Sequence, residues 1–307
     1  MAKRSSRVIM ACMAVLVLTA LSCGISTPTP DTAQELALQQ TAVSLAQTQT
    51  AMAVPVTEEI VTDAPPVVTE ETPEVTEATP EPDICYEGIC FSFDSSIAAG
   101  AVGATIPAED YGDDAFPGAN HPAYFEFTFI NYALASHFHT PAIRVYPIAP
   151  YIMMDNAVAP NLGEMYTVLG TQPTAGISQN LPFMPFWNAG QVFTAKSAYF
   201  DFQSGSGLRY LTMYGQALYP IDNTNLFYTY QGVTSDGQYY VSAILPVTNP
   251  GLPADGSSTI DDWETFTNLW DSYISQAVMF LEDWSPESYT PQLALLDAMM
   301  QSLSINR

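Results

Sequence analysis

Basic residues are scarce in this sequence: its 307 residues hold 7 Lys and Arg against 32 Asp and Glu, a formal net charge of −25. Binding to a phosphate backbone needs a basic stripe or patch, so nucleic acid is excluded as a partner. The chain also has no Gly-x-Ser-x-Gly elbow, no His-Glu-x-x-His motif, no Walker loop and no Rossmann glycine fingerprint. These absences predict no cofactor and weigh against an enzyme, although a catalytic triad assembled in space leaves no local motif.

The N-terminus has the pattern of an export signal. Basic residues precede an apolar run over residues 8–21, and these 14 residues fall short of the roughly 20 that a membrane span needs. The run ends in Ala20-Leu21-Ser22-Cys23-Gly24, which resembles the lipobox of bacterial lipoproteins. The usual lipobox has Leu three places before the cysteine and a small residue two places before it, whereas this chain has Ala20 and Leu21 there.

The lipobox resemblance implies that residues 1–22 are a signal peptide and that Cys23 carries fatty-acyl chains such as palmitate. Such chains would hold the protein on the extracytoplasmic face of the cell membrane without a spanning segment. The alternative is a plain secretion signal cut nearby, which would leave Cys23 as a spare thiol. We predict the lipid anchor, because the polar stretch after Cys23 offers no folded role for a thiol.

Residues 23–82 are predicted to be the acylated cysteine followed by a disordered tether. Residues 24–82 lack Lys, Arg, Cys and every aromatic residue, so they cannot bury enough apolar surface to fold. The Ala/Gln/Thr-rich part, 32–54, has heptad-spaced apolar residues, which leaves open a transient helix or a self-associating stalk. The Pro/Thr/Glu-rich part, 55–82, is expected to be extended, and its composition leaves O-glycosylation open.

Residues 83–307 are predicted to form one extracytoplasmic domain. They hold all the aromatic residues, all three histidines and the last two cysteines, and their number is within the range of a single domain. Four residues separate Cys85 from Cys90, whereas metal and redox motifs normally separate such a pair by two. Outside the cytoplasm we therefore predict a Cys85–Cys90 disulfide across a turn at residues 86–89.

Alternating and hairpin patterns predict an antiparallel sheet in this domain. Phe125, Phe127 and Phe129 would share one face of a strand, and Asp236-Gly237 would turn the clearest hairpin. The predicted strands cover residues 89–93, 124–132, 137–145, 191–202, 208–214, 226–234 and 238–247.

Apolar residues at three- and four-residue steps predict a long helix over 260–284. A last helix is predicted to have Thr290 as its cap and Pro291 at its first position, and shorter helical stretches are expected around 149–155 and 161–169. The predicted fold class is α+β: a single antiparallel sheet of about six or seven strands with helices packed on it.

Three segments carry a family resemblance: Gly207–Gly215, the hairpin of Leu226–Gly232 with Gln238–Pro246, and the C-terminal Leu296–Ile305. They are similar to a group of uncharacterised bacterial lipoproteins and, more distantly, to PsbP-like domains. The resemblance implies a PsbP-like sandwich, in which an antiparallel sheet lies between helices and the chain ends on a helix followed by Ser-Leu-x-Ile. It also implies a protein-binding or assembly role, and it brings no catalytic residues with it.

His137-Phe138-His139 is the local pattern most typical of a site. If it lies on a strand, residues two apart share a face, so both imidazoles could meet one metal ion with His121 or Glu126 as a third ligand. The favoured alternative is that both histidines stand at the start of a strand, facing solvent or bonded to backbone. The metal site would support a metal-dependent hydrolase.

A second candidate is the loop Glu109–Asp114, which places four carboxylates within six residues. Oxygen ligands on a loop are what Ca²⁺ prefers, but the spacing does not match an EF-hand. We therefore favour a solvated acidic loop and predict no metal site.

Cations and aromatic residues on the predicted strands are the remaining candidates. Arg144, Lys196 and Arg209 could converge on a carboxylate or phosphate ligand, although the favoured alternative is that each pairs with one of the many acidic residues. The aromatic residues at 199–202, 226–230 and 239–240 could line a groove. The favoured alternative is that they are core, because aromatic residues that alternate along a strand more often pack inside.

The leading hypothesis from the sequence is a membrane-anchored extracytoplasmic lipoprotein whose domain is a non-enzymatic binding or assembly module of unknown ligand. Its partners would be the membrane, through the lipid anchor, and a protein or other cationic partner attracted by the acidic domain. The alternative hypothesis is a metal-dependent hydrolase that uses His121, His137 and His139.

Overall fold

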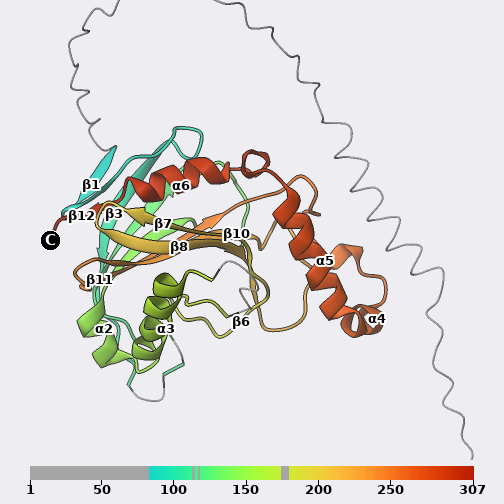
Figure 1. The fold of residues 1–307 in the computed structure, drawn as a ribbon, viewed down its shortest axis with the longest axis horizontal. Helices are drawn as coiled ribbons and strands as arrows, with labels where there is room; N and C mark the ends of the chain where they lie inside the picture. Colours follow the sequence, from blue (N-terminus) through green and yellow to red (C-terminus); the bar gives the residue numbers. More distant parts are fainter. Residues whose placement is uncertain (1–82, 113–114, 117, 174–179) are drawn as a thin grey trace, which may run out of the picture. The chain divides into compact units, whose positions relative to one another are not determined.

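A seven-stranded antiparallel sheet organises the domain in the computed structural model, which describes residues 83–112, 115–116, 118–173 and 180–307 (Figure 1). The strand order is β3-β4-β5-β11-β10-β8-β7, and every neighbouring pair is antiparallel. The predicted α+β class, with an antiparallel sheet and helices packed on it, is confirmed, but the described residues form this main sheet and two small sheets rather than the single sheet predicted. The strands are β3 (Gly100–Ile106), β4 (Tyr124–Ile130), β5 (Ala142–Pro147), β7 (Ala195–Phe202), β8 (Gly205–Thr212), β10 (Phe227–Thr234) and β11 (Tyr239–Pro246).

A separate three-stranded sheet joins the two ends of the domain. β1 (Ile84–Tyr86) and β2 (Ile89–Phe91) form a hairpin, and β12 (Ser304–Ile305) pairs with β2. Both residues of the hairpin turn have positive φ, as a two-residue turn of this kind requires. Cys85 lies directly opposite Cys90 in the hairpin, and the two form the predicted disulfide.

Both faces of the main sheet are covered by helices. On one face, strand side chains pack against α5 (Trp270–Asp283) and α6 (Leu293–Gln301). On the other face they pack against α2 (Ile148–Met154) and α3 (Val158–Thr171). Figure 1 shows α6 and the pair of α2 and α3 on opposite sides of the strands. Burial on both faces explains why the central strands β8, β10 and β11 are almost wholly buried.

The face assignment predicted for β4 is confirmed. Phe125, Phe127 and Phe129 all pack in the core that includes α5 and α6. Tyr124 points to the other side and packs against the cluster around α2 and α3. This alternation places Tyr124 and Glu126 on the face where the cavity described below opens.

The predicted long helix over 260–284 is instead two helices, α4 (Trp263–Asn268) and α5. The side chain of Asp262 caps α4 by accepting from the backbone N–H groups of Glu264 and Thr265. The chain then turns at Leu269, whose φ and ψ of −100° and 7° lie outside the α-helical region. Short 3-10 helices lie on either side, at Ser257–Thr259 and Pro286–Ser288.

The predicted start of the last helix is wrong. Thr290 pairs with Thr248 through two backbone hydrogen bonds of 2.9 and 3.0 Å. Its backbone is therefore used in β-type pairing rather than as a helix cap, and α6 begins three residues later, at Leu293.

Candidate functional site

A cavity of about 1110 Å³ opens on the face of the sheet that carries α2 and α3. Its lining is mostly aromatic and uncharged polar, and among the described residues its carboxylates are Asp222 and Asp255 and its Arg is Arg144. Apart from β4, β5, β11 and α2, the described lining comes from residues 116, 118 and 121 and from connecting segments within 138–140, 185–189, 213–219, 222–225 and 255–257. The segment 213–219 includes β9 (Tyr214–Gly215), which pairs with β6 (Gly190–Gln191).

One wall of the cavity is an aromatic cluster around Trp187. The indole stacks on His139, with ring centroids 4.8 Å apart and planes inclined by 5°. Phe183 and Tyr214 meet the indole edge-on, and Phe227 of β10 contacts both the indole and the imidazole. These rings come from four separate segments of the chain, so tertiary packing creates this wall.

Buried polar side chains tie the loop before Trp187 to the sheet. Gln231 accepts from the N–H of Met184 at 3.0 Å, and the hydroxyl of Ser242 donates to the Met184 carbonyl oxygen. Oδ1 of Asn161 in α3 accepts from the backbone N–H of Phe183 at 3.1 Å. Gln231 and Ser242 are fully buried, so these bonds satisfy polar groups that would otherwise be costly to bury, and they hold the loop in place.

A second part of the lining is polar. Nε of Arg144 donates to Oε2 of Glu126 at 2.7 Å, and both side chains are mostly buried. The rings of Tyr124, Tyr146 and Tyr151 form a continuous row, with successive centroids 4.6 and 5.2 Å apart. The hydroxyl of Tyr151 is buried without a hydrogen-bond partner among the described residues. Such a group calls for water or a ligand as its partner.

Burial favours the uncharged forms of His139, Tyr146 and Tyr151 in this cavity. Burial lowers the pKa of His139 to about 4, and the charges of His137 and Arg144 act in the same direction. Burial also raises the pKa of Tyr146 and of Tyr151. The positive charge of Arg144 lowers the pKa of Tyr146, but burial has the larger effect. The cavity therefore offers a neutral imidazole and neutral hydroxyl groups.

Exposed aromatic rings form part of the rim. Phe138 is 72% exposed and Tyr219 is 45% exposed, and Phe116 resembles Phe138 in its exposure. Phe138 meets the ring of His139 edge-on and so continues the aromatic wall outward. Large apolar rings that stand in water beside a cavity indicate a surface that a bound partner covers.

No family model, curated protein or solved structure matches this chain. The interpretation of the site therefore depends on its own residues and their geometry.

The metal site that the histidine pattern left open, as the less favoured alternative, does not form among the described residues. β5 begins only after Pro141, whose missing N–H suits the edge of a strand, so His137 and His139 lie in a loop. His139 belongs to the aromatic wall, and Nε2 of His121 lies 3.8 Å from Oε2 of Glu109. No three His, Cys, Asp or Glu side chains in the described part of the chain are grouped to hold a metal ion.

The predicted acidic loop lies partly outside the described residues, because Asp113 and Asp114 are not among them. Glu109 accepts from the hydroxyl of Tyr111 at 2.8 Å, and Asp110 accepts from the N–H of the glycine two residues later at 2.9 Å. Both bonds lie within the loop itself, on its exposed surface.

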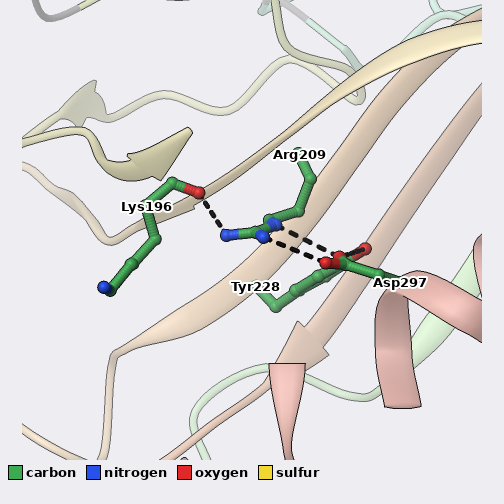
Figure 2. A network of polar contacts seen from close by, with 4 residues as sticks. All are labelled: Lys196, Arg209, Tyr228 and Asp297. Atoms are coloured by element: carbon green, nitrogen blue, oxygen red, sulfur yellow. Dashed lines mark hydrogen bonds and ion pairs between the residues drawn. The ribbon is translucent and has the colours of Figure 1, made fainter. Parts of the chain in front are cut away.

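The three cations of the strands do not converge. Arg144 pairs with its glutamate on the face of α2 and α3, whereas Arg209 pairs with Asp297 of α6 on the opposite face, Nη2 to Oδ2 at 2.9 Å. Figure 2 shows that Arg209 also donates to the carbonyl oxygen of Lys196 and that Tyr228 shares Asp297. The two arginines therefore pair with carboxylates, as the favoured alternative predicts.

The aromatic residues at 199–202, 226–230 and 239–240 are mostly core, as the favoured alternative predicts, and they do not line the cavity. The aromatic rings of β10 and most of those facing them are core, and the cavity draws its exposed rings from loops. The segment 181–189, Leu-Pro-Phe-Met-Pro-Phe-Trp-Asn-Ala, carried the missed signal. Its two prolines exclude a regular helix or central strand, so its three aromatic rings have to pack from a loop.

Cys23 and the rest of residues 1–82 lie outside the described residues, and the predicted signal peptide, acylation and tether stay predictions. Within the described part of the chain, no helix combines the length and the apolar character that crossing a membrane would require.

Proposed function

We propose that this protein is a membrane-anchored extracytoplasmic lipoprotein whose domain binds a ligand in the cavity beside Trp187. The sequence supports the anchor through the lipobox-like segment that ends at Cys23 and through the polar stretch that follows it. The domain supports the binding role through a large cavity whose rim exposes aromatic rings.

The observation that carries this proposal is the combination of a stacked aromatic wall and an unpartnered, buried hydroxyl in one cavity. The stack of Trp187 on His139 is held by a loop that buried hydrogen bonds fix to the sheet. The Tyr151 hydroxyl is without a partner among the described residues. A preformed, mostly apolar cavity with a few polar groups is the usual form of a ligand site.

Binding is favoured over the alternative of a metal-dependent hydrolase by the state of His139. Its ring is stacked against Trp187 and packed on Phe227, and its pKa is lowered to about 4. An imidazole packed between other aromatic rings in this way forms part of the cavity wall rather than acting as a metal ligand.

A relationship to PsbP-like domains is also part of the proposal. Its support is the sheet between helices and the C-terminal order of α6, then Ser302-Leu303-Ser304-Ile305, of which the last two residues form β12. This relationship would favour a binding or assembly role for the domain.

Replacing the predicted acylation site tests the anchor. We expect Cys23→Ser to remove the acyl chains and to shift the protein from the membrane fraction to the soluble fraction, because the acyl chains are the proposed attachment to the bilayer. Fractionation and the mass of the N-terminal peptide measure this, with the domain substitution Tyr166→Ala as the control that stays in the membrane. Wild-type protein with an unmodified N-terminus, free in the medium, would contradict the anchor.

A further inference from the structure

The exposed rings of the rim restrict the kind of ligand that fits the proposed binding function. Phe138 and Tyr219 line the cavity and are 72% and 45% exposed, so they present their rings to solvent. Aromatic faces exposed beside polar groups suit a ligand that has both an apolar face and hydrogen-bonding edges. A pyranose ring has this character, because its C–H groups form a face and its hydroxyls lie around the edge.

The polar groups of the lining match hydroxyl groups. Asn188, Gln216 and Asn225 bring amides to the lining, and Thr140 and Thr224 bring hydroxyls. The side chains of Gln216, Asn225 and Thr224 each donate one hydrogen bond within the protein, and their side-chain oxygens remain as acceptors. Amides and hydroxyls both donate and accept hydrogen bonds, which is what a ligand hydroxyl needs from its surroundings.

The charges of the cavity favour an uncharged ligand. Glu126 already neutralises Arg144 at 2.7 Å, so an added ligand carboxylate would compete with Glu126 for the guanidinium. The remaining N–H groups of a guanidinium can still donate to neutral oxygen atoms. Oδ1 of Asp222 accepts from N–H groups of Thr224 and Asn225 in its own loop, and Oδ2 accepts from the backbone N–H of Gly256 in a distant segment, which leaves Asp222 little capacity to hold a cation.

One residue of the lining carries a buried hydroxyl without a partner among the described residues. The Tyr151 hydroxyl is buried and lacks a partner among the described residues, and its side chain lines the cavity. A buried hydroxyl left unpaired is costly, so a ligand group that pairs with it gains affinity.

From these observations we propose that the cavity binds an uncharged saccharide, with Phe138 and Tyr219 stacking on sugar rings and Arg144 and Tyr151 bonding to sugar hydroxyls. This proposal rests on the proposed binding function and narrows it to one class of ligand. The size of the cavity, about 1110 Å³, accommodates several sugar rings rather than one.

Titration calorimetry on the full-length protein tests the proposal. The protein is held in a polyoxyethylene detergent, because detergents with sugar headgroups would compete for the cavity. The probes are maltohexaose, cellohexaose, xylohexaose and chitohexaose, with an oligogalacturonate of similar length as the anionic comparison. We expect one or more of the four uncharged probes to bind at one site per chain and the anionic probe to bind at least about tenfold more weakly.

Variants locate the binding in the cavity. We expect Phe138→Ala with Tyr219→Ala to weaken binding by about tenfold or more, and Tyr151→Phe to weaken it while keeping the ring. Both rim residues are exposed, so their truncation is expected to leave the melting temperature unchanged. Tyr166→Ala, which removes an exposed ring outside the lining, is the matched control and is expected to bind normally.

Failure of all four probes to bind at millimolar concentration would overturn the proposal, as would binding that the rim and Tyr151 variants leave unchanged. Equal binding of the anionic probe would also overturn it. A photo-crosslinking residue at position 138 separates this proposal from the broader one. Capture of a ligand of another chemical class in cells would overturn the saccharide inference and leave the proposed binding function standing.

Discussion

Arg209 is the most deeply buried of the four basic residues in the domain, with 7% of its surface exposed. It makes a two-pronged contact with Asp297, Nε to Oδ1 at 3.1 Å and Nη2 to Oδ2 at 2.9 Å, and the hydroxyl of Tyr228 donates to the same carboxylate. The network, drawn in Figure 2, connects β8 and β10 with α6. A buried charge of this kind depends on its partner, because the interior does not solvate it.

Removing the carboxylate of this pair is expected to destabilise the domain strongly. We expect Asp297→Ala to lower the free energy of unfolding by about 3 kcal/mol, since it leaves the Arg209 guanidinium buried without a counter-charge. Urea denaturation measures the loss. Asp283→Ala removes an exposed carboxylate at the end of α5 and is expected to change stability by no more than about 0.5 kcal/mol. Equal effects of the two substitutions would show that the network contributes nothing.

His139 makes the stability of the domain depend on pH. Its pKa in the folded protein is lowered to about 4, chiefly by burial, whereas in the unfolded chain it is about 6.5. The unfolded chain therefore binds the proton more readily between these values, so stability falls as the pH falls from about 6.5 to about 4. The contribution at stake is at most about 3 kcal/mol.

The substitution His139→Phe isolates this effect, because phenylalanine keeps an aromatic ring in the wall and does not titrate. We expect the stability of the variant relative to wild type to increase by about 2 kcal/mol between pH 7 and pH 4.5. Urea denaturation of both proteins at pH 7, 5.5 and 4.5 measures the difference. A difference that stays constant across this range would contradict the assignment.

At the scale of elements, pattern alone predicts the hairpin of β10 and β11 but not β3. The hairpin has long runs of β-forming residues around Asp236-Gly237, and its turn forms there with Gly237 at positive φ. β3, Gly100–Ile106, consists of small residues without a large apolar alternation. It exists because β4 pairs along its whole length and because Tyr86 packs on Gly103, where a Cβ atom would lie 2.4 Å from that side chain.

The candidate site was predictable only in fragments. His139 and Arg144 stand out in the sequence as a histidine pattern and a rare cation, but nothing local connects either one with Trp187. Trp187 comes to line the same cavity as these residues because Gln231 and Ser242, in the centre of the sheet, hydrogen-bond to the loop that carries it. Contacts of this kind join residues that are distant in the chain, and periodicity carries no information on them.

The hairpin of β1 and β2 is the element where the tether would meet the domain, and its disulfide is expected to stabilise the domain modestly. The loop that Cys85 and Cys90 close is short, so the chain-entropy model gives about 2 kcal/mol. We expect Cys85→Ser with Cys90→Ser to lower the free energy of unfolding by that amount, measured by urea denaturation. Dithiothreitol is expected to lower the free energy of unfolding of the wild-type protein by the same amount and to leave that of the double variant unchanged. A loss of stability in the double variant on adding dithiothreitol would contradict this explanation.

At the scale of the whole molecule, acidic charge and the cavity are kept apart. Residues 83–307 hold 22 acidic and 4 basic residues, a net charge of −18, yet the described lining includes two carboxylates, Asp222 and Asp255, and the neutralised Arg144. The strong negative field repels anionic surfaces and polymers, while most of the acidic residues lie away from the described lining of the cavity. This division fits a domain that is held at a membrane by its lipid, stays clear of anionic headgroups and takes an uncharged ligand.

The central claim is that the cavity beside Trp187 is the ligand-binding site of this protein, and photo-crosslinking in intact cells tests it most directly. p-Benzoylphenylalanine is placed at position 138 on the rim and, as the control, at position 166, which is also exposed but outside the lining. We expect a discrete adduct on illumination at position 138, whose mass identifies the ligand, and none at position 166. No adduct at position 138, or the same adducts at both positions, would contradict it.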